Sequence, residues 1–301
     1  MSFTLSFKQK GIEPGLVLRM GQVFRFQSPS SGVLYGAEGD AWYILSKAGD
    51  DWQIESNHDL AKIERFFRLD HPPQEVWQKV KQIDPRLASL PTEGVEGLTL
   101  LRPSSFIEAL FGFLCSQNNT LHRIMPMTRH LGSYGPVIHE TRWGALNAFP
   151  GLETLAGIQP EQLKSAGFGY RAPHIPRAAN AVLEKGGEAW LDELKAIDYE
   201  EAVARLCTLP GIGRKLAECI LLYGADRIES VPVDTHLWKT AAPLYLPVEF
   251  QEPLTPGRAA RLSSVMRDRF GDLAGWAHLL LFAASLTQGP SKSLMKENLK
   301  G

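Results

Sequence analysis

Two helix-like segments joined by a short glycine turn constrain this chain more than any other feature. YEEAVARLC is followed by TLPGIG and then by RKLAECILLYG, over residues 199–224. Pro210 cannot continue the first helix, and Gly211 and Gly213 supply positive φ or close backbone approach. Amides of such a turn point outward at a helix N-terminus, where the helix dipole adds positive potential, so the turn suits one phosphate. The spacing is not that of a Walker loop, and plain helix–helix packing is the alternative.

Lys215 stands at the head of a helix that is apolar on nearly all sides. Such a helix is buried, so we expect this lysine at the edge of a partly dry cavity. Desolvation, the neighbouring Arg214 and the positive helix end all disfavour its charge. They predict a pKa lowered toward the ~7–8 that suits an amine nucleophile. An ordinary solvated lysine is the alternative.

Asp234 follows nineteen residues later in VPVDTHLW, directly before an amphipathic segment. Aspartate is a good helix N-cap, which is the structural interpretation. A helical unit that folds back on the hairpin would also bring this carboxylate near Lys215. There it could stabilise a developing cation or assist proton transfer.

Charge and cysteine content limit the classes of partner and cofactor. The net charge is −1; the first hundred residues carry 11 Lys and Arg against 13 Asp and Glu, and the rest carry 21 against 20. Contacts with nucleic acid must therefore use a few placed groups and backbone amides rather than a broad cationic face. Cys115, Cys207 and Cys219 lack CxxC spacing, which argues against a disulfide framework, structural zinc or an iron–sulfur cluster. No apolar run approaches ~18 residues, so we expect no membrane span, and the N-terminus does not read as a secretory signal.

The periodicity of apolar residues changes near residue 103. Before it, LVLRMGQVFRF, VLYG, WYILS and WQIES are β-prone runs separated by turn residues, which predicts an antiparallel meander. After it the spacing is helical, with a Ser105–Glu108 capping box before FIEALFGFLC and Thr120 as the next cap. The prediction is an α+β chain with a β-rich domain over 1–102 and a helical domain over 103–301 that frays from 287. Helices are predicted at 58–68, 72–83, 106–116, 120–131, 141–148, 151–156, 160–166, 171–185, 187–195, 199–207, 213–224, 235–245, 256–270 and 272–286.

Six ordered blocks resemble one known family. They are MGQVFRF, SFIEALFGFLCSQNNTLHRI, GFGYRAPHIPRAANAVLEKGGEAWLDEL, CTLPGIGRKLAECI, VPVDTHLW and AGWAHLLLF. Together they resemble the eukaryotic-type 8-oxoguanine DNA glycosylase/AP lyases, which belong to the helix–hairpin–helix superfamily with a Gly-Pro-Asp signature. The resemblance implies an N-terminal antiparallel β domain and a two-lobed, all-helical body. It also implies a bifunctional base-excision repair enzyme that acts on oxidised guanine in double-stranded DNA.

The resemblance assigns the reacting groups. Lys215 matches the family's nucleophile, which attacks C1′ of the flipped nucleotide, expels the base and forms a Schiff base that undergoes β-elimination. Asp234 matches the essential aspartate. The turn of Gly211 and Gly213 matches the hairpin that holds a DNA phosphate, with a cation on the backbone of Cys207 and Leu209 when DNA is bound. His236 matches a phosphate-contacting histidine, against the alternative of a partly buried helix histidine.

The resemblance also implies a pocket for the damaged base. Gly21 matches a glycine whose carbonyl reads the extra N7–H of the oxidised guanine, a group that undamaged guanine lacks. Cys219 and Phe282 match the two residues that sandwich the base. His278 lies on the same helix face as Phe282 and departs from the family, which usually has glutamine there. The histidine puts fine substrate preference in doubt and suggests pH dependence.

A last group of residues matches the part of the family site that faces the opposite strand. Asn118 matches the residue that fills the gap left by the flipped nucleotide, and Tyr170 matches a wedge. Arg123 and Arg171 match the pair that recognises the orphaned cytosine, which implies a preference for cytosine opposite the lesion. Thr120 departs slightly from the family's run of asparagines. Loop or helix-start roles are the structural alternatives for Asn118 and Arg171.

Competing interpretations are an alkyl-base glycosylase of the same superfamily and a non-catalytic helix–hairpin–helix DNA-binding module. The first lacks a lysine at position 215, and the second needs neither that lysine nor Asp234. Endonuclease III and adenine glycosylases carry a four-cysteine cluster near the C-terminus, whereas Cys219 is the last cysteine here. We therefore expect no required cofactor and a monomer. The lack of a basic targeting run favours a bacterial cytoplasm over a nucleus.

Overall fold

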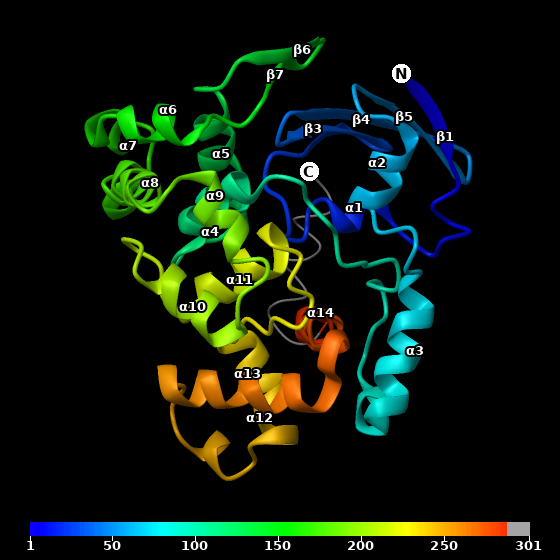
Figure 1. Cartoon of the computed structure of the whole chain (residues 1–301). Helices are drawn as coiled ribbons and strands as arrows, with labels where there is room; N and C mark the ends of the chain where they lie inside the picture. Colours follow the sequence, from blue (N-terminus) through cyan, green and yellow to red (C-terminus); the bar gives the residue numbers. More distant parts are fainter. Residues whose placement is uncertain (288–301) are drawn as a thin grey trace.

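The computed structural model describes residues 1–287 and has an antiparallel sheet followed by a helical body, so the α+β prediction is confirmed (Figure 1). The strands pair in the order β1-β5-β4-β3-β2, all antiparallel. The predicted frayed tail lies, except for its first residue, outside the described residues. The strands of this sheet are β1 Ser2–Leu5, β2 Gln27–Ser30, β3 Val33–Glu38, β4 Ala41–Ala48 and β5 Asp51–Ser56.

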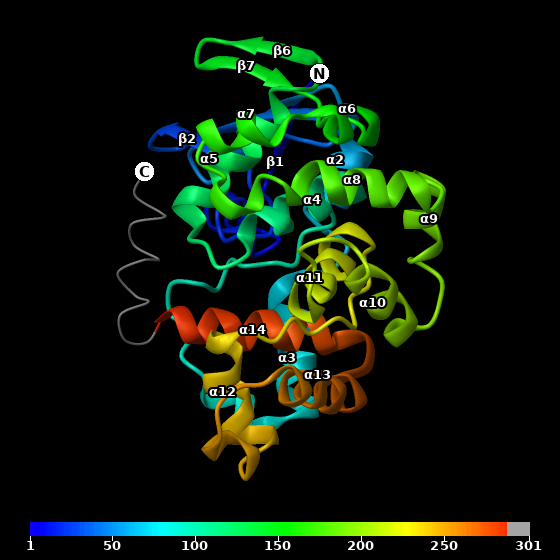
Figure 2. The same ribbon diagram turned by 90° about the vertical axis from the view of Figure 1, so that its left-hand side faces the viewer.

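Most of the predicted helices form close to their expected bounds. The short helix α1 (Pro14–Val17) and the helices α2 and α3 belong to the N-terminal part, and the others build the body (Figure 2). Their bounds are α2 Leu60–Phe66, α3 Pro73–Ile83, α4 Phe106–Ser116, α5 Leu121–Gly132, α6 Leu152–Gly157, α7 Pro160–Ser165, α8 His174–Glu184, α9 Glu188–Glu193, α10 Tyr199–Cys207, α11 Arg214–Gly224, α12 Thr235–Tyr245, α13 Pro256–Phe270 and α14 Ala274–Thr287, with 3₁₀ turns at Pro85–Ser89, Gly169–Arg171, Glu249–Gln251 and Gly271–Leu273.

The body has two lobes that meet at α11. This helix packs on α4 on one side and contacts α13 on the other, while α12, α13 and α14 pack together. The N-terminal part does not stay apart, because α3 packs along α14 and α13 (Figure 1). The domain boundary at residue 102 therefore remains a prediction. Helix α3, which precedes this boundary, packs with helices of the second lobe.

The predicted strand LVLRMGQVFRF is wrong. Residues 16–26 instead contain the end of α1 and a buried loop. Their polar side chains alternate with apolar ones, but they are buried with partners: Gln22 Nε2 donates to the Thr99 carbonyl at 2.8 Å, and Arg25 pairs with Glu108. Alternation marks a strand only when the polar face meets water, so the pattern was misleading here.

A β-hairpin replaces the helix predicted over 141–148 and corrects the all-helical body. Strands β6 (Val137–Thr141) and β7 (Gly144–Asn147) pair with each other and lie over the sheet (Figure 1). His139 stacks on Trp42 with 3.7 Å between ring centroids, and Trp143 packs on Tyr35 at 5.0 Å. Contacts with a distant aromatic surface decided the local structure, as happens for short segments of mixed propensity.

Only half of the predicted capping box at the start of α4 forms. Ser105 Oγ accepts the Glu108 amide at 3.1 Å, but the Glu108 carboxylate turns away to Arg25. Glu38 from the end of β3 takes its place, because its carboxylate accepts the amides of Ser104 and Ser105 at 2.9 and 2.8 Å. Thr120 is also the N-cap residue of α5, but its side chain makes no capping bond. A carboxylate from the sheet thus ties the β domain to the first helix of the body.

Glu38 makes the stability of this joint pH-dependent. Burial, followed by the nearby Glu108 charge, raises the pKa of Glu38 to about 7. A raised carboxyl pKa means that the folded state holds the proton longer than the unfolded chain, so its stability falls as pH rises from about 4.5 toward 7. We expect Glu38→Gln to remove this fall and to reduce the Tm loss between about pH 5 and pH 8 by a few degrees.

Thermal unfolding followed by circular dichroism across this pH range tests the expectation. Glu55→Gln is the control, because Glu55 is an exposed carboxylate on the same sheet. Parallel Tm curves for wild type and Glu38→Gln would contradict the assignment.

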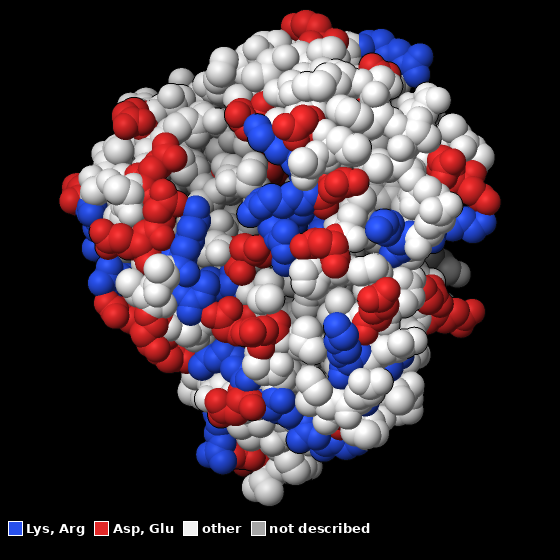
Figure 3. Space-filling model, turned by 45° about the vertical axis from the view of Figure 1, so that its right-hand side comes forward, with Lys and Arg blue, Asp and Glu red and all other residues white. Residues whose placement is uncertain are grey.

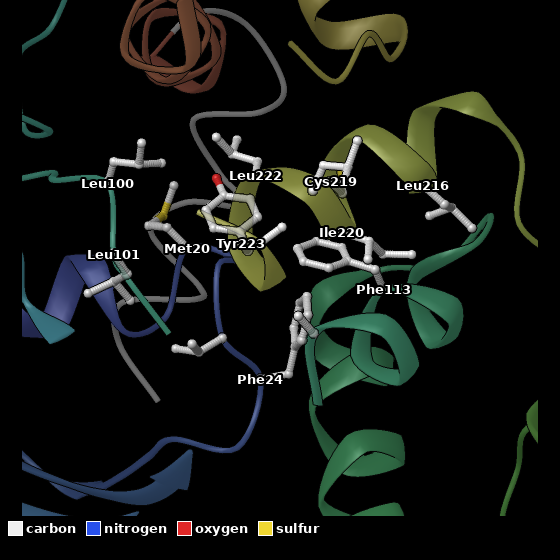
Figure 4. Packing of buried hydrophobic residues seen from close by; sticks show 14 of the residues in the cluster. Met20, Phe24, Leu100, Leu101, Phe113, Leu216, Cys219, Ile220, Leu222 and Tyr223 are labelled. Carbon is white, nitrogen blue, oxygen red and sulfur yellow. The ribbon is translucent and has the colours of Figure 1, made fainter. Parts of the chain in front are cut away.

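The loop that replaces the predicted strand packs against the centre of the body. Phe24 stands edge-on to Phe113 of α4, with ring centroids 5.2 Å apart, and Phe113 stacks on Tyr223 of α11 at 5.4 Å. Figure 4 shows Met20 and Phe24 of the loop facing the apolar side chains of α4 and α11. This packing holds the Met20–Gly21 backbone next to α11.

Candidate active site

A cavity of about 600 Å³ opens where the N-terminal loop meets both lobes of the body. Its walls come from residues 20–24, the end of α4, the start of α5, α11, the 232–236 segment and α14. Seven of the predicted residues line it together: Gly21, Lys215, Cys219, Asp234, His236, His278 and Phe282. The structure thus gathers side chains that are as far as 261 residues apart in sequence around one space, as expected of a binding site.

The hairpin forms as predicted, although its two glycines differ. Gly211 has φ +83°, and a Cβ there would lie 3.0 Å from His174 and Leu114, so this position requires glycine. Gly213 is extended, with φ −101° and ψ 174°, and is the N-cap of α11. Gly213 therefore has neither the positive φ nor the close backbone approach that was predicted as the reason for the two glycines. A Cβ at Gly213 would meet nothing within 4 Å, so its glycine leaves open space in front of the helix amides.

Lys215 is half-buried in the first turn of α11 and lines the cavity. The predicted lowering of its pKa is wrong. The interaction with the Cys219 sulfur, one turn along, and the negative charge of Asp234 raise the pKa of Lys215 above its ordinary value, against burial, which lowers it. The neighbouring Arg214, which has the same charge as Lys215, is paired with acidic side chains, with Glu200 Oε2 at 2.8 Å and Glu218 Oε1 at 3.0 Å. In the free protein, Lys215 is therefore an ammonium at neutral pH.

Cys219 is buried and faces the same cavity. Burial raises the pKa of its thiol to about 11, so the sulfur is neutral near pH 7. A neutral, polarizable thiol can pack against an aromatic base. The predicted placement as a pocket wall agrees with this geometry.

Asp234 caps α12 and also faces the cavity. Its Oδ1 accepts the amides of His236 and Leu237 at 2.9 and 2.8 Å, so the predicted N-cap is confirmed. These bonds fix the carboxylate where its charge acts on Lys215 and on His278. One residue thus serves the fold and the electrostatics of the cavity.

His278 and Phe282 lie one turn apart on α14, with rings nearly parallel at 14° and centroids 6.2 Å apart. His278 is 8 % exposed, and its Nδ1 is buried without a hydrogen-bond partner among the described residues. Burial lowers the pKa of His278 to about 4, so the ring is neutral above that value.

This neutral ring corrects the pH dependence suggested by the sequence. We expect the pH–rate profile of base excision between about pH 5.5 and pH 8 to keep its shape in His278→Gln, because the histidine does not titrate in that range. Single-turnover rates of both proteins across the range check this. An inflection near neutral pH that only the variant lacks would show that His278 titrates there.

The residues predicted to face the opposite strand lie outside the cavity lining. Asn118 has φ +44°, a strained value for a residue other than glycine. Arg171 is buried and donates to the carbonyls of Gln117 and Asn118, at 2.8 Å to each. Tyr170 is exposed and its hydroxyl donates to the Gln117 carbonyl at 3.1 Å, whereas Arg123 is exposed on α5. Arg171 and Tyr170 therefore hold the turn that presents Asn118.

The cavity includes residues that the sequence did not single out as functional. Ser116, Asn119 and His122 are among its lining residues. They lie in the QNNTLH stretch or next to it, where the sequence predicted a DNA contact for Asn118 and a helix cap for Thr120. The sequence feature that could have identified them is this polar stretch itself, which separates two helical segments with apolar faces.

The face of the molecule in Figure 3 has no broad basic area. On the side shown in Figure 3, Lys and Arg are interspersed with Asp and Glu. Within residues 1–287 there is no cluster of three or more His, Cys, Asp or Glu side chains arranged to hold a metal. No described helix is long and apolar enough to cross a membrane.

Comparison with known proteins places the chain in a family. An N-glycosylase/DNA lyase OGG1 of Arabidopsis thaliana is 34% identical over 295 residues, which cover 94% of this chain and 80% of that protein. The chain belongs to this family. An N-glycosylase/DNA lyase of Saccharomyces cerevisiae is 29% identical over 76% of this chain and 68% of its own. No protein-family model matches the chain.

The OGG1 family fold also appears among solved structures. An 8-oxoguanine glycosylase/lyase of Clostridium acetobutylicum, in complex with double-stranded DNA that has cytosine opposite 8-oxoG, superposes with a TM-score of 0.79. The two are 23% identical, and the match covers 92% of each chain. Membership of the OGG1 family favours an N-glycosylase/DNA lyase over a non-catalytic DNA-binding module.

Proposed function

We propose that this protein is a bifunctional base-excision enzyme that removes 8-oxoguanine from double-stranded DNA, opposite cytosine, and then cleaves the strand as an AP lyase. Membership of the OGG1 family supports the activity. The single observation that carries the site is the cavity in which Lys215, Cys219 and Asp234 meet Phe282 and Gly21. In this proposal a flipped base enters the cavity and lies between the Cys219 thiol and the Phe282 ring.

In the proposed reaction, Lys215 Nζ bonds to C1′ of the flipped nucleotide while the C1′–N9 bond breaks and its electron pair leaves with the base. The C1′–O4′ bond of the resulting aminal then breaks: O4′ takes a proton, the lysine nitrogen loses one, and a C1′=N Schiff base forms. The Schiff base loses a C2′ proton, and the 3′ phosphate departs by β-elimination. The Lys215 ammonium must lose its proton before it attacks. A base that fills the cavity expels water, and this desolvation favours the neutral amine. The Asp234 carboxylate then offsets the positive charge that develops on the sugar.

Gly21 is the proposed reader of the lesion. Its backbone has φ +83° and lines the cavity, held there by the packing of Met20 and Phe24. A carbonyl oxygen accepts the N7–H of 8-oxoguanine and repels the N7 lone pair of guanine. Cys219 and Phe282 would contact the two faces of the base, and the neutral His278 would face its edge.

The hairpin is the proposed binding site for the DNA backbone. The amides in front of α11 would bind one phosphate, and His236, exposed at the start of α12, would bind another. A cation bound with DNA would be held by the carbonyls of Cys207 and Leu209 at the end of α10. The Leu209 carbonyl supports this, because among the described residues its oxygen accepts only the Ile212 amide, at 3.1 Å, and keeps a second lone pair. Such a cation would neutralise phosphate charge, and no other cofactor is proposed.

Borohydride trapping tests the function. The protein is mixed with a duplex that contains 8-oxoguanine opposite cytosine and reduced during turnover, and we expect a covalent protein–DNA adduct. A duplex with undamaged guanine is the control. Absence of an adduct, or equal adduct with undamaged guanine, would overturn the proposal.

Excision measured opposite each of the four bases tests the role of Arg123. We expect wild type to favour cytosine and Arg123→Ala to lose about tenfold in rate on that duplex alone. Arg177→Ala removes another exposed arginine, from α8, and is the control. Flat rates across all four bases would refute the assignment of Arg123 and Arg171.

The proposed partner is DNA alone, bound by a monomer. A bacterial cytoplasm or nucleoid remains our proposal for its location, on the lack of a basic targeting run. The relatives from Arabidopsis thaliana and Saccharomyces cerevisiae do not support that choice.

A further inference from the structure

A buried charged network joins α11 to its neighbours through residues that do not line the cavity. Its central residue is Glu218, which is 1 % exposed. Its Oε1 accepts from Arg214 Nε at 3.0 Å and from Ser263 Oγ of α13 at 2.8 Å. Arg214 also donates to both oxygens of Glu200 on α10, at 2.8 and 2.9 Å. The network therefore joins α10, α11 and α13.

The network answers an electrostatic problem at the start of α11. The first turn of this helix contains two adjacent cations, Arg214 and Lys215, and no acidic residue. Cations are disfavoured at the positive end of a helix dipole, and the N-cap is Gly213, which has no side chain to bind the helix amides. The Glu200 carboxylate neutralises Arg214, and the hydrogen bonds to Glu200 and Glu218 draw Arg214 toward α10 and α13, leaving Lys215 as the cation that lines the cavity.

We propose that Glu218, held by Arg214 and Ser263, is a positioning residue that fixes the first turn of α11 so that Lys215 points at the reacting carbon. This inference rests on the proposed function and adds a residue to its site. Glu218 does not line the cavity. It acts because it shares a helical turn with both Lys215 and Cys219, and because a displacement of about 1 Å in a nucleophile can cost two orders of magnitude in rate.

The charged and titratable groups around Glu218 come from each packed helix. Tyr199, Glu200 and Cys207 approach from α10, Arg267 from α13, and Lys215 and Cys219 from α11 itself. Arg267 of α13 binds Glu200 of α10 at 2.6 Å, so these two helices are joined without α11. The bond between Arg214 and Glu218 is the part of the network that lies within α11. Arg214 and Glu218 are thus the pair to vary.

The test compares chemistry with binding. In Glu218→Gln, we expect the single-turnover rate of adduct formation on 8-oxoguanine DNA to fall about tenfold, with the Kd for the same DNA unchanged within twofold. Glu201→Gln is the control, since Glu201 is an exposed carboxylate on α10 paired with Arg205. Arg214→Met and the double variant complete a cycle. If the pair acts as one unit, the double variant loses no more than the worse single variant.

Each result decides the proposal. An unchanged adduct rate in folded Glu218→Gln overturns it, as does a Kd that weakens in step with the rate, or additive losses in the cycle. Should Glu218→Gln fail to fold, Ser263→Ala removes one bond to the same carboxylate, and a wild-type rate in that variant also overturns it. If wild type itself forms no adduct, the proposed function fails and this inference with it. If wild type forms the adduct and Glu218→Gln matches it, only the positioning role fails.

Discussion

Lys215→Gln is expected to abolish borohydride-trapped adduct and to lower base excision by at least about 10³-fold, because the amide cannot bond to C1′ or form a Schiff base. The variant should fold. It replaces a half-buried lysine at the start of α11 with an uncharged polar side chain of similar length, which leaves no cavity and no unpaired charge on that helix turn. Wild-type and variant proteins are compared in single-turnover assays on the 8-oxoguanine duplex and by thermal unfolding.

The matched control for this prediction is Lys79→Gln, which removes an exposed lysine from α3. It should leave both the adduct and the excision rate at wild-type levels. Binding of the intact duplex by Lys215→Gln should persist, because the hairpin amides do not depend on that side chain. An undiminished adduct in Lys215→Gln would show that another amine is the nucleophile and would overturn the assignment of Lys215.

The raised pKa of Lys215 gives the reaction a definite pH dependence. The free enzyme holds a proton on this amine at neutral pH, so excision should accelerate as pH rises from about 6 to 9. The sequence predicted the opposite shift. It showed the two cations and the helix end, which lower the pKa, but not how the fold places Cys219 and Asp234 around the amine or Glu200 and Glu218 around Arg214.

Local structure was predicted correctly from the sequence where interactions between neighbouring residues determine it. Pro210, Gly211 and the apolar faces of 214–224 specify a hairpin and a buried helix, and Asp234 specifies a cap. The ordered blocks of the family resemblance then brought distant residues such as Gly21 and Phe282 to one cavity, which periodicity alone could not do. The predictions for residues 16–26 and 141–148 were wrong for a common reason, which is that tertiary contacts overrode the local pattern. Buried polar partners did so at 16–26, and a remote aromatic surface did so at the hairpin.

Asp234 is where the fold and the chemistry can be separated by two substitutions. Asparagine accepts the same capping bonds as aspartate, so Asp234→Asn should unfold within a few degrees of wild type. It lacks the negative charge, so excision should fall about 10²–10³-fold, the usual cost of losing one group that stabilises developing charge. Asp234→Ala loses both, and we expect a further loss of about 1 kcal/mol in the free energy of unfolding.

Asp198→Asn is the matched control, since Asp198 caps α10 through the amides of Glu200 and Glu201 at 2.9 and 3.1 Å. It makes the same chemical change at another aspartate N-cap and should leave excision unchanged. A wild-type excision rate in Asp234→Asn would reduce Asp234 to its capping role. An unfolding temperature in Asp234→Asn as low as that of the alanine variant would instead assign the lost activity to a displaced α12. The intermediate result, full stability with slow excision, is the one that requires the charge beside Lys215.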